Sequence, residues 1–478
     1  MKYIFPLFFI ASVSLGQNIY PTENPLFIKT LEKDSIINEL GILYDLLNTI
    51  HPGQFMHTEK AVFDNCYDSL RKSIQTDLTT IEYYCKTSLL LSKIKDGHTW
   101  VENSTIKKQL QNELVFPFSV YKASDKFIIS KSGTEEYNSF IGKTILKIND
   151  KSISEIVSKV KPYISLEGEN ETGMNYTFQL FPFYYFFIDS SNTFKLDYLD
   201  SIGNNATTVL KGIEYREFTK NTRRIVEPIH QEFKEGKIAI LTVNTFYIGD
   251  FEYYKINYKK YIDDFFKKVE KLKISSLIID VRGNSGGSAE VSNYLFSYLT
   301  DKPYYYFEYV GKKYKKTAEW KFYSTSPQYI NDVDTATTKF INNLHCEVET
   351  DKKNYWWFEK QKGKRKYHKG EIITLIDGGC FSTTGHFVSL LKDNQIGKLY
   401  GECTQGSYYS NDGGHMFQLP YSKLLVRIPT AQFKMRMPNF QYNPKGICPD
   451  LEINKKPDDF KTKYDRQLDS VIEQLSGR

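Results

Sequence analysis

The stretch that decides the fold runs Ile372-Ile-Thr-Leu-Ile-Asp-Gly-Gly-Cys-Phe-Ser382-Thr-Thr-Gly-His-Phe-Val-Ser-Leu-Leu391. Its apolar start predicts a short buried strand over residues 372–376, and Phe387, Leu390 and Leu391 recur behind it at helical spacing. A glycine-rich turn separates strand from helix, so Ser382 lies near the predicted helix N-terminus. Unpaired backbone N–H groups and the helix dipole can stabilise an oxyanion at that place.

Ser382 also fits a purely structural role. Serine is a preferred N-cap residue, whose hydroxyl accepts a hydrogen bond from a backbone N–H of the first helical turn. The stretch by itself is compatible with either a cap or a nucleophile, so the rest of the chain has to decide.

The composition describes a large globular chain. Its 478 residues exceed what one hydrophobic core supports, so we expect two or three domains. The net charge of +6 comes from lysines scattered among acidic residues, which is typical of solvated faces. Because the sequence has no zinc-finger pattern, aromatic-basic motif or continuous basic arm, we expect no nucleic-acid partner.

The first residues predict export. Residues 1–16 combine one lysine, a short apolar run and the small residues Ser14 and Gly16, which is typical of a secretory signal peptide. No later segment approaches the roughly 20 apolar residues of a membrane helix, so no stable membrane span is expected. The mature protein is therefore predicted to begin near Gln17 and to be periplasmic or secreted.

Six cysteines remain in an exported, oxidising setting that permits disulfides. The connectivity stays open, with Cys66–Cys85 and Cys403–Cys448 as candidate pairs. The cysteine spacing fits no zinc site and the histidines form no HExxH pair, so neither a metal nor a cofactor is expected.

Residues 17–105 predict a helical N-terminal region. Apolar residues recur at helical spacing over 35–50, and a second helix is expected near 62–74. Thr79 with Glu82 forms a capping-box pattern ahead of a third helix, which Gly97 is expected to stop. His98 is thereby placed at a helix-to-strand corner.

Residues 113–215 are β-rich, with a strand expected over 141–150 and a helix over 153–160. This part resembles a PDZ-type module. The charged residues 216–237 are interpreted as a linker.

Residues 238–478 predict a layered α/β core. A strand at 238–243, an amphipathic helix at 254–269 and a strand at 277–281 precede the turn Arg282-Gly-Asn-Ser-Gly-Gly287 and a helix from Ala289. The aromatic and basic residues 304–369 form an insertion, which is either a lid or substrate wall or a solvated excursion packed by its own aromatics.

Three separated motifs carry a family resemblance. Asp96-Gly-His-Thr99, Asp280-Val-Arg-Gly-Asn-Ser-Gly-Gly287 and Gly378-Gly-Cys-Phe-Ser382 occur in that order, followed by Gly401-Glu-Cys-Thr-Gln-Gly406 and Gly446-Ile-Cys-Pro-Asp450. Together they resemble the C-terminal processing (tail-specific) serine peptidases and the related tricorn-core peptidases. The resemblance implies a crotonase-like α/β catalytic core, a helical N-terminal region, a PDZ-like module between them, and peptide or protein substrates.

The resemblance also implies catalytic roles. Ser382 matches the nucleophile, and the amides of Thr383 and of Gly286 or Gly287 match the oxyanion hole. Glycine suits that role, because no Cβ keeps its N–H away from the developing charge. Taken alone, the turn that contains Gly286 and Gly287 would be an ordinary tight loop.

The base differs between the branches of the family. Tail-specific enzymes carry a lysine directly after the GE-x-T-x-G element, where this chain has Ser407, so a Ser/Lys dyad is not expected. The tricorn-like branch uses an N-terminal histidine, which His98 matches. An imidazole ordinarily titrates near about pH 6.5, so hydrolysis is predicted to fall away below about pH 6.

The group that orients His98 is left open. Gly97 and Asn443 stand where the tricorn-like branch has a serine and a glutamate, so Asp96 and Asn443 are the candidate orienting groups. Asp96 fits an exposed turn residue equally well. His386, one helical turn after Ser382, is a competing base, although a partly exposed helix histidine is its simpler interpretation.

These features predict an exported serine peptidase that forms an acyl-enzyme on Ser382 with His98 as general base. A non-catalytic peptide- or ligand-binding protein on a degenerate peptidase scaffold is the alternative, favoured by the departures at Gly97, Ser407 and Asn443. An esterase acting on small acyl substrates is a third, weaker alternative.

Overall fold

The computed structural model describes residues 30–200, 202–222, 226–235, 237–318, 320–348, 355–364, 368–462 and 464–477. The predicted signal peptide, residues 1–16, lies outside the described residues. The described chain is a mixed α/β fold with several separate sheets. None of its described helices is long and apolar enough to cross a membrane.

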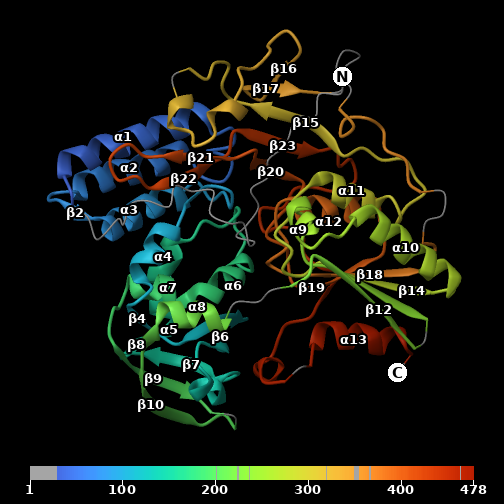
Figure 1. Cartoon of the computed structure of the whole chain (residues 1–478), viewed down its shortest axis with the longest axis horizontal. Coiled ribbons are helices and arrows are strands. Elements are labelled where there is room, and N and C mark those ends of the chain that lie inside the picture. The colour runs from blue at the N-terminus through green and yellow to red at the C-terminus, as the bar shows by residue number, and fades with distance from the viewer. Residues whose placement is uncertain are drawn as a thin grey trace.

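Helices dominate the N-terminal region, as predicted. They are α1 (Lys33–Ile50), α2 (Lys60–Ser73) and α3 (Thr80–Ser92), which lie together at one end of the molecule (Figure 1). The Thr79–Glu82 capping box is present at the start of α3. This helix ends before Gly97, because Lys95 already takes a left-handed backbone with φ 56°.

A C-terminal hairpin packs on these helices. The short strand β3 (Trp100–Val101) pairs antiparallel with β22 (Leu425–Ile428), which pairs with β21 (His415–Gln418). Phe417, Val426 and Ile428 of the hairpin are buried in the same hydrophobic core as the N-terminal helices. The pairing of β22 with β3 therefore brings distant chain segments together next to the His98 turn, and Figure 1 shows β21 and β22 beside α1, α2 and α3.

The β-rich region is an antiparallel sheet of order β10-β9-β7-β6-β5, with β8 paired to β7. The predicted helix over 153–160 is present as α5, and the Ser152 side chain caps it. The elements of this region are α4 (Ser104–Leu110), β4 (Leu114–Val115), β5 (Phe118–Ala123), β6 (Lys126–Ser132), β7 (Thr144–Ile148), β8 (Lys151–Ser152), α5 (Ile153–Val160), α6 (Gly173–Thr177), α7 (Phe181–Phe186), β9 (Thr193–Leu199), β10 (Asn205–Lys211) and β11 (Ile213–Glu214).

The charged stretch 216–237 contains secondary structure where the structure describes it. It contains most of α8 (Tyr215–Thr222) and all of β12 (Ile229–Lys234). Strand β12 pairs antiparallel with β13 along its whole length. In this edge strand, Ile229 and Phe233 alternate with polar residues and pack into the hydrophobic core on one face of the sheet, while the polar side chains face away from it.

The C-terminal region is built on a sheet of order β12-β13-β14-β18-β19-β24, parallel from β13 onward. Its central strands are buried on both faces, as parallel strands with helices on each side must be. Helices α10, α11 and α12 cover one face and α13 covers the other (Figure 1). The bounds are β13 (Ile238–Val243), α9 (Ile248–Tyr253), α10 (Tyr258–Lys271), β14 (Ser276–Asp280), α11 (Ala289–Phe296), β18 (Glu371–Ile376), α12 (Thr383–Asp393), β19 (Lys398–Gly401), β24 (Leu451–Glu452) and α13 (Arg466–Leu475).

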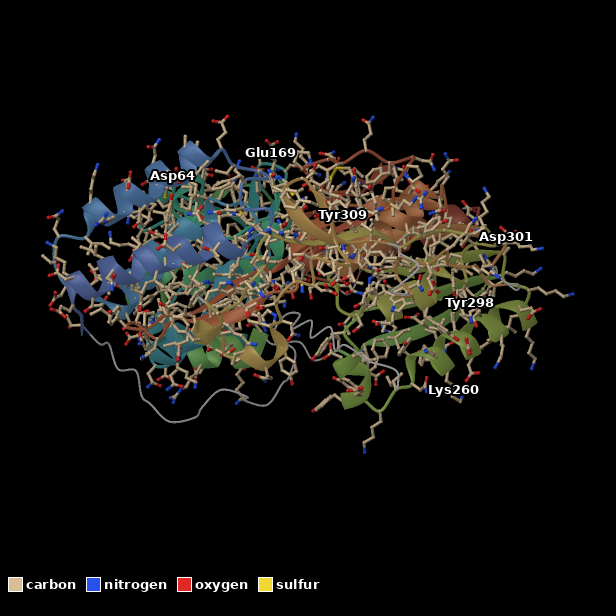
Figure 2. All side chains as sticks on the ribbon, turned by 90° about the horizontal axis from the view of Figure 1, so that it is seen from above. Asp64, Glu169, Lys260, Tyr298, Asp301 and Tyr309 are labelled. Atoms are coloured by element: carbon tan, nitrogen blue, oxygen red, sulfur yellow. A yellow bond between two sulfur atoms is a disulfide. The ribbon has the colours of Figure 1, made fainter. Side chains whose placement is uncertain are left out.

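Where the structure describes it, the insertion 304–369 contributes strands to a sheet shared with the C-terminal region. It supplies β15 (Phe307–Lys312), β16 (Lys339–Ile341) and β17 (Leu344–Glu347) to a sheet of order β16-β17-β15-β23-β20. The partner strands are β20 (Tyr409–Asp412) and β23 (Ala431–Met435). Tyr309 of β15 is buried and lies between the two ends of the molecule (Figure 2). The insertion thus supports the strand that ends at Asp412.

One of the two candidate disulfides forms. Cys403 is bonded to Cys448, so that the strand end after β19 is joined to the approach to β24. The other candidate pair, Cys66 and Cys85, is wrong, because both residues carry free thiols.

Candidate active site

Ser382 occupies a strained position between β18 and α12. Its backbone has φ 51° and ψ −126°, a conformation that non-glycine residues adopt at a cost of about 1–3 kcal/mol and that clusters at functional sites. Its side chain makes no capping hydrogen bond; the hydroxyl instead donates to Asp412 Oδ2 at 3.4 Å. The side-chain N-cap interpretation of Ser382 is therefore wrong.

The glycine turn after β14 is pressed against Ser382. A Cβ built on Gly286 would lie 2.8 Å from Ser382 Cβ and 2.9 Å from Thr383 N. The Thr383 hydroxyl donates to Gly287 O at 2.6 Å, which joins the two turns directly. The turn is therefore more than an ordinary tight loop, because any side chain at Gly286 would collide with the turn that carries Ser382.

Two amides remain free beside Ser382. Gly286 N already donates to Asn284 Oδ1 at 2.9 Å. Within the described part of the chain, Gly287 N and Thr383 N donate to no acceptor. Of the predicted oxyanion-hole residues, Gly287 and Thr383 thus have N–H groups available for a negatively charged oxygen, while Gly286 provides the close approach.

His98 lies in the turn between α3 and β3 and faces the same carboxylate as Ser382. Its ring stacks on Phe381 at 4.2 Å between centroids, and its Nε2 lies 3.5 Å from Asp412 Oδ2. The structure therefore brings His98 and Ser382 to one carboxylate oxygen. Among the described residues no direct hydrogen bond joins the two side chains, which is common in catalytic sites without substrate.

Asp412 is a site residue that the sequence reasoning missed. It ends β20, is 2% exposed, and its Oδ1 accepts a 2.6 Å hydrogen bond from Arg427. The same guanidinium donates to His98 O at 2.9 Å, so Arg427 holds both groups. Burial opposes ionisation, but His98 and Arg427 outweigh it and lower the pKa of Asp412.

Asp96 lies on the other side of the His98 ring. Its Oδ1 is 3.9 Å from His98 Nδ1 and accepts the His98 backbone N–H at 2.7 Å. Its Oδ2 lies 3.0 Å from His51 Nε2. Asp96 is fully buried, so the exposed-turn interpretation is wrong. Burial raises the pKa of Asp96, but the neighbouring imidazoles of His51 and His98 lower it by more, and the net shift is downward.

Gly97 has a steric reason to replace the serine of the tricorn-like branch. A Cβ built there would lie 2.7 Å from Phe381 Cζ and 3.0 Å from Gln405 Nε2. Its N–H donates to Glu167 Oε2 at 2.9 Å. The close packing of Phe381 on the base side therefore requires glycine at this position.

The remaining candidates lie elsewhere. Asn443 is exposed, and its side chain accepts a hydrogen bond from Lys445 N at 3.0 Å within its own turn, so the structure does not bring it to His98. His386 is 2% exposed rather than partly exposed, and its Nε2 lies 3.3 Å from Ser410 Oγ. Burial lowers the pKa of His386 to about 3, which makes it a poor proton acceptor. Ser407 is buried near Gly385.

Residues 237–453 match the model of peptidase family S41. This part of the chain is similar to the S41 peptidases. The resemblance to C-terminal processing peptidases is thereby confirmed, and so is the assignment as a serine-type peptidase, which acts on peptide or protein substrates.

Solved structures of mature CPAF share the fold of this chain. Mature CPAF superposes with a TM-score of 0.63 at 15% identity, over 93% of this chain and 98% of that chain. Mature CPAF complexed with lactacystin also gives 0.63, at 16% identity over 93% and 99% of the two chains. The photosystem II D1 C-terminal processing protease gives 0.44 at 12% identity, over 92% and 97%. No curated protein matches the sequence.

Proposed function

We propose that this serine-type peptidase hydrolyses peptide bonds through an acyl-enzyme on Ser382, with His98 as general base. The observation that carries the proposal is the shared carboxylate: Ser382 Oγ and His98 Nε2 lie 3.4 and 3.5 Å from the same Asp412 oxygen. The strained backbone of Ser382 and the two free amides beside it support the same assignment.

Acylation begins when the Ser382 hydroxyl turns from Asp412 to His98 Nε2. The imidazole takes the hydroxyl proton as Oγ attacks the peptide carbonyl carbon. The carbonyl oxygen becomes an oxyanion, which accepts hydrogen bonds from Gly287 N and Thr383 N. Each such donor contributes about 3–4 kcal/mol to transition-state stabilisation in serine peptidases.

The protonated base is stabilised by the carboxylates on its two sides. Asp412 faces Nε2 and Asp96 faces Nδ1, so the imidazolium lies between two ionised groups. It gives its proton to the leaving amine as the C–N bond breaks. Water then loses a proton to His98, attacks the ester on Ser382, and releases the new carboxylic acid as the proton returns to the serine oxygen.

The nucleophile can be tested with a fluorophosphonate probe, which forms a covalent bond with an activated serine. We expect the wild type and Ser389→Ala to be labelled and Ser382→Ala to remain unlabelled. Ser389 is a suitable control because it is a buried serine on the same helix whose hydroxyl bonds only to Gly385 O at 2.7 Å. Tryptic mapping of the modified peptide identifies the residue.

Equal labelling of wild type and Ser382→Ala would reject the assignment. Absence of labelling in the wild type, together with peptides that co-purify and stay uncleaved, would favour the non-catalytic binding protein instead. The two outcomes are distinguishable in one experiment, since the first retains reactivity at another residue and the second shows none.

We further propose that the protein is exported, to the periplasm or beyond. The Cys403–Cys448 disulfide supports this, because structural disulfides persist in oxidising compartments and are rare in the cytosol. N-terminal sequencing of the purified protein is expected to begin near Gln17. A mature protein that retains its first residues and stays in the cytosolic fraction would contradict the proposal.

For the fold we propose a crotonase-like core over residues 238–478 and a PDZ-like module over residues 113–215. The helix-covered parallel sheet and the antiparallel sheet with α5 support the two assignments. A PDZ-like module predicts tail recognition, so Ser382→Ala protein should bind peptides with a free C-terminal carboxylate more tightly than their amidated copies. Equal affinity for both peptides would remove that role.

A further inference from the structure

A second polar cluster lies on the side of His98 that faces away from Ser382. Asp96, His98 and Glu167 each offer one ligand atom, and the three atoms lie within 4.8 Å of one another. All three residues are buried, with exposures of 0%, 4% and 4%. They come from the turn after α3 and from the loop ahead of α6, which no sequence motif connects.

Two of the atoms that face this cluster lack a hydrogen-bond partner. Within the described residues His98 Nδ1 makes no hydrogen bond, and Asp96 Oδ1 lies 3.9 Å from it. Glu167 Oε1 makes none either and lies 3.5 Å from His57 Nε2. Buried polar atoms of this kind are costly unless a partner satisfies them. His98 Nδ1 and Glu167 Oε1 are therefore available to bind a ligand.

Each of the two carboxylates has a polar neighbour outside the cluster. His51 Nε2 lies 3.0 Å from Asp96 Oδ2, and Gly97 N donates to Glu167 Oε2 at 2.9 Å. Metal-binding carboxylates usually have such outer partners, which orient them before the ion arrives. The surrounding charge also favours a cation, because Asp96, Glu167 and Asp412 surround His98 while Arg427 balances only Asp412.

We propose that Asp96, His98 Nδ1 and Glu167 form a site for Zn²⁺, and that the bound ion inhibits the peptidase. One imidazole nitrogen with two carboxylate oxygens suits Zn²⁺ better than Mg²⁺, which prefers all-oxygen octahedral sites. Zn²⁺ bonds of about 2.0–2.2 Å place tetrahedral ligand atoms roughly 3.3–3.6 Å apart, so the three ligand atoms must move closer together when the ion binds.

Inhibition follows from the two nitrogens of the imidazole ring, and this step rests on the proposed function. An ion on Nδ1 occupies the lone pair there, so the proton of the neutral ring must reside on Nε2. His98 Nε2 then donates to Asp412 and has no lone pair to accept the Ser382 proton. Removal of the ion restores the base.

Zinc binding can be measured without catalysis. Chelator-stripped Ser382→Ala protein is titrated with Zn²⁺ and separately with Mg²⁺ by calorimetry, and we expect one Zn²⁺ per chain and no saturable Mg²⁺ binding. Adding Glu167→Gln should weaken Zn²⁺ binding at least about tenfold. Adding Glu39→Gln should leave it unchanged, since Glu39 is a buried glutamate on α1 that bonds to Ser422 N instead.

His98→Ala tests the site a second time, and peptide hydrolysis by the wild type tests the inhibition. His98→Ala removes the nitrogen ligand and is expected to weaken Zn²⁺ binding as Glu167→Gln does, with circular dichroism reporting that both proteins are folded. In wild-type protein, Zn²⁺ should abolish peptide hydrolysis and a chelator should restore it.

The outcomes separate the two proposals. No saturable Zn²⁺ binding to the Ser382→Ala protein, or an affinity for Zn²⁺ that Glu167→Gln and His98→Ala leave unchanged from that protein, overturns the site. Binding at the site with unchanged hydrolysis overturns the inhibition. Failure of the proposed function would appear differently, as absence of probe labelling at Ser382 in metal-free protein, and would leave the zinc titration intact.

Discussion

The two sides of the active site are built in different ways. The nucleophile side consists of two turns that follow neighbouring parallel strands, β14 and β18, whose residues Asp280 and Leu375 are paired. The base side consists of the His98 turn, which is held by β22, Arg427 and the end of β20. The first side is local in sequence and the second is tertiary.

This difference determines how each side of the active site is held in position. Because the carboxyl ends of adjacent parallel strands meet at one edge of a sheet, the Gly286 and Ser382 turns come together wherever the two strands pair. The position of His98 beside Asp412 depends instead on tertiary contacts, because β3 pairs with β22 and Arg427, which lies 329 residues after His98, bonds to both groups. The base side is therefore the more vulnerable to single changes.

The largest expected effect is the loss of the base. His98→Ala should lower kcat on a fluorogenic peptide by on the order of 10⁶-fold, because removal of the histidine of a serine triad costs about as much as removal of the whole triad. His386→Gln serves as the histidine control and should keep most of the activity. If His386→Gln lost activity and His98→Ala kept it, His386 would be the base. The base would then lie on the nucleophile side, and the division of the site into two sides would be wrong.

The next effect tests the carboxylate that both side chains share. Asp412→Asn keeps the shape but removes the charge beside His98 and Arg427, and we expect kcat to fall on the order of 10⁴-fold, as when the carboxylate of a triad becomes an amide. Asp393→Asn is the matched control, since Asp393 is a buried carboxylate that accepts from Asn439 N at 2.7 Å. Equal activity in the two variants would assign Asp412 a structural role only.

A third variant disturbs the nucleophile side by adding one methyl group beside Ser382. Gly286→Ala places a Cβ 2.8 Å from Ser382 Cβ, so the free amides should shift and kcat should fall about 10²- to 10³-fold, the usual cost of losing one oxyanion donor. Gly283→Ala is the control, because it has a similarly positive φ of 72° but open space around its Cβ. Comparable losses in both would show that backbone strain, and not contact with Ser382, is responsible.

The nucleophile side could be predicted from sequence in most of its parts. Strand β18, the Ser382 turn and helix α12 occupy the expected residues, because apolar periodicity and glycine punctuation are local signals. The choice between Gly286 and Gly287 could not be predicted, since it depends on the Asn284 side chain that occupies the Gly286 amide.

The base side could be predicted only in part. The capping box at Thr79 and the family motif located His98, but nothing near Asp412 distinguishes it from any acidic residue before two glycines. Its role depends on β20 pairing with β23 and on Arg427, which are contacts between strands and carry no short-range signal. Glu167 was missed for the same reason.

A smaller effect concerns stability on the nucleophile side. Burial lowers the pKa of His386 from 6.5 to about 3, so between these values the unfolded chain binds a proton that the folded chain excludes. The free energy of unfolding should therefore fall as pH decreases below about 6.5, by up to about 1.4 kcal/mol per pH unit from this group. Urea midpoints between pH 7 and pH 4 should depend less on pH in His386→Gln, and an unchanged slope would contradict the burial of a neutral ring.

The smallest effect sharpens the comparison from the base side. Thr79 caps α3, the helix that leads into the His98 turn, through its hydroxyl and the Glu82 backbone N–H at 3.2 Å. Thr79→Ala should destabilise the helix by about 1 kcal/mol, whereas Thr79→Ser should retain the cap. Hydrogen exchange should quicken in α3 and in the His98 turn but not in α12. Equal protection of α3 in the alanine and serine variants would show that tertiary packing alone fixes the start of this helix, and that the base side depends less on its local sequence than the nucleophile side does.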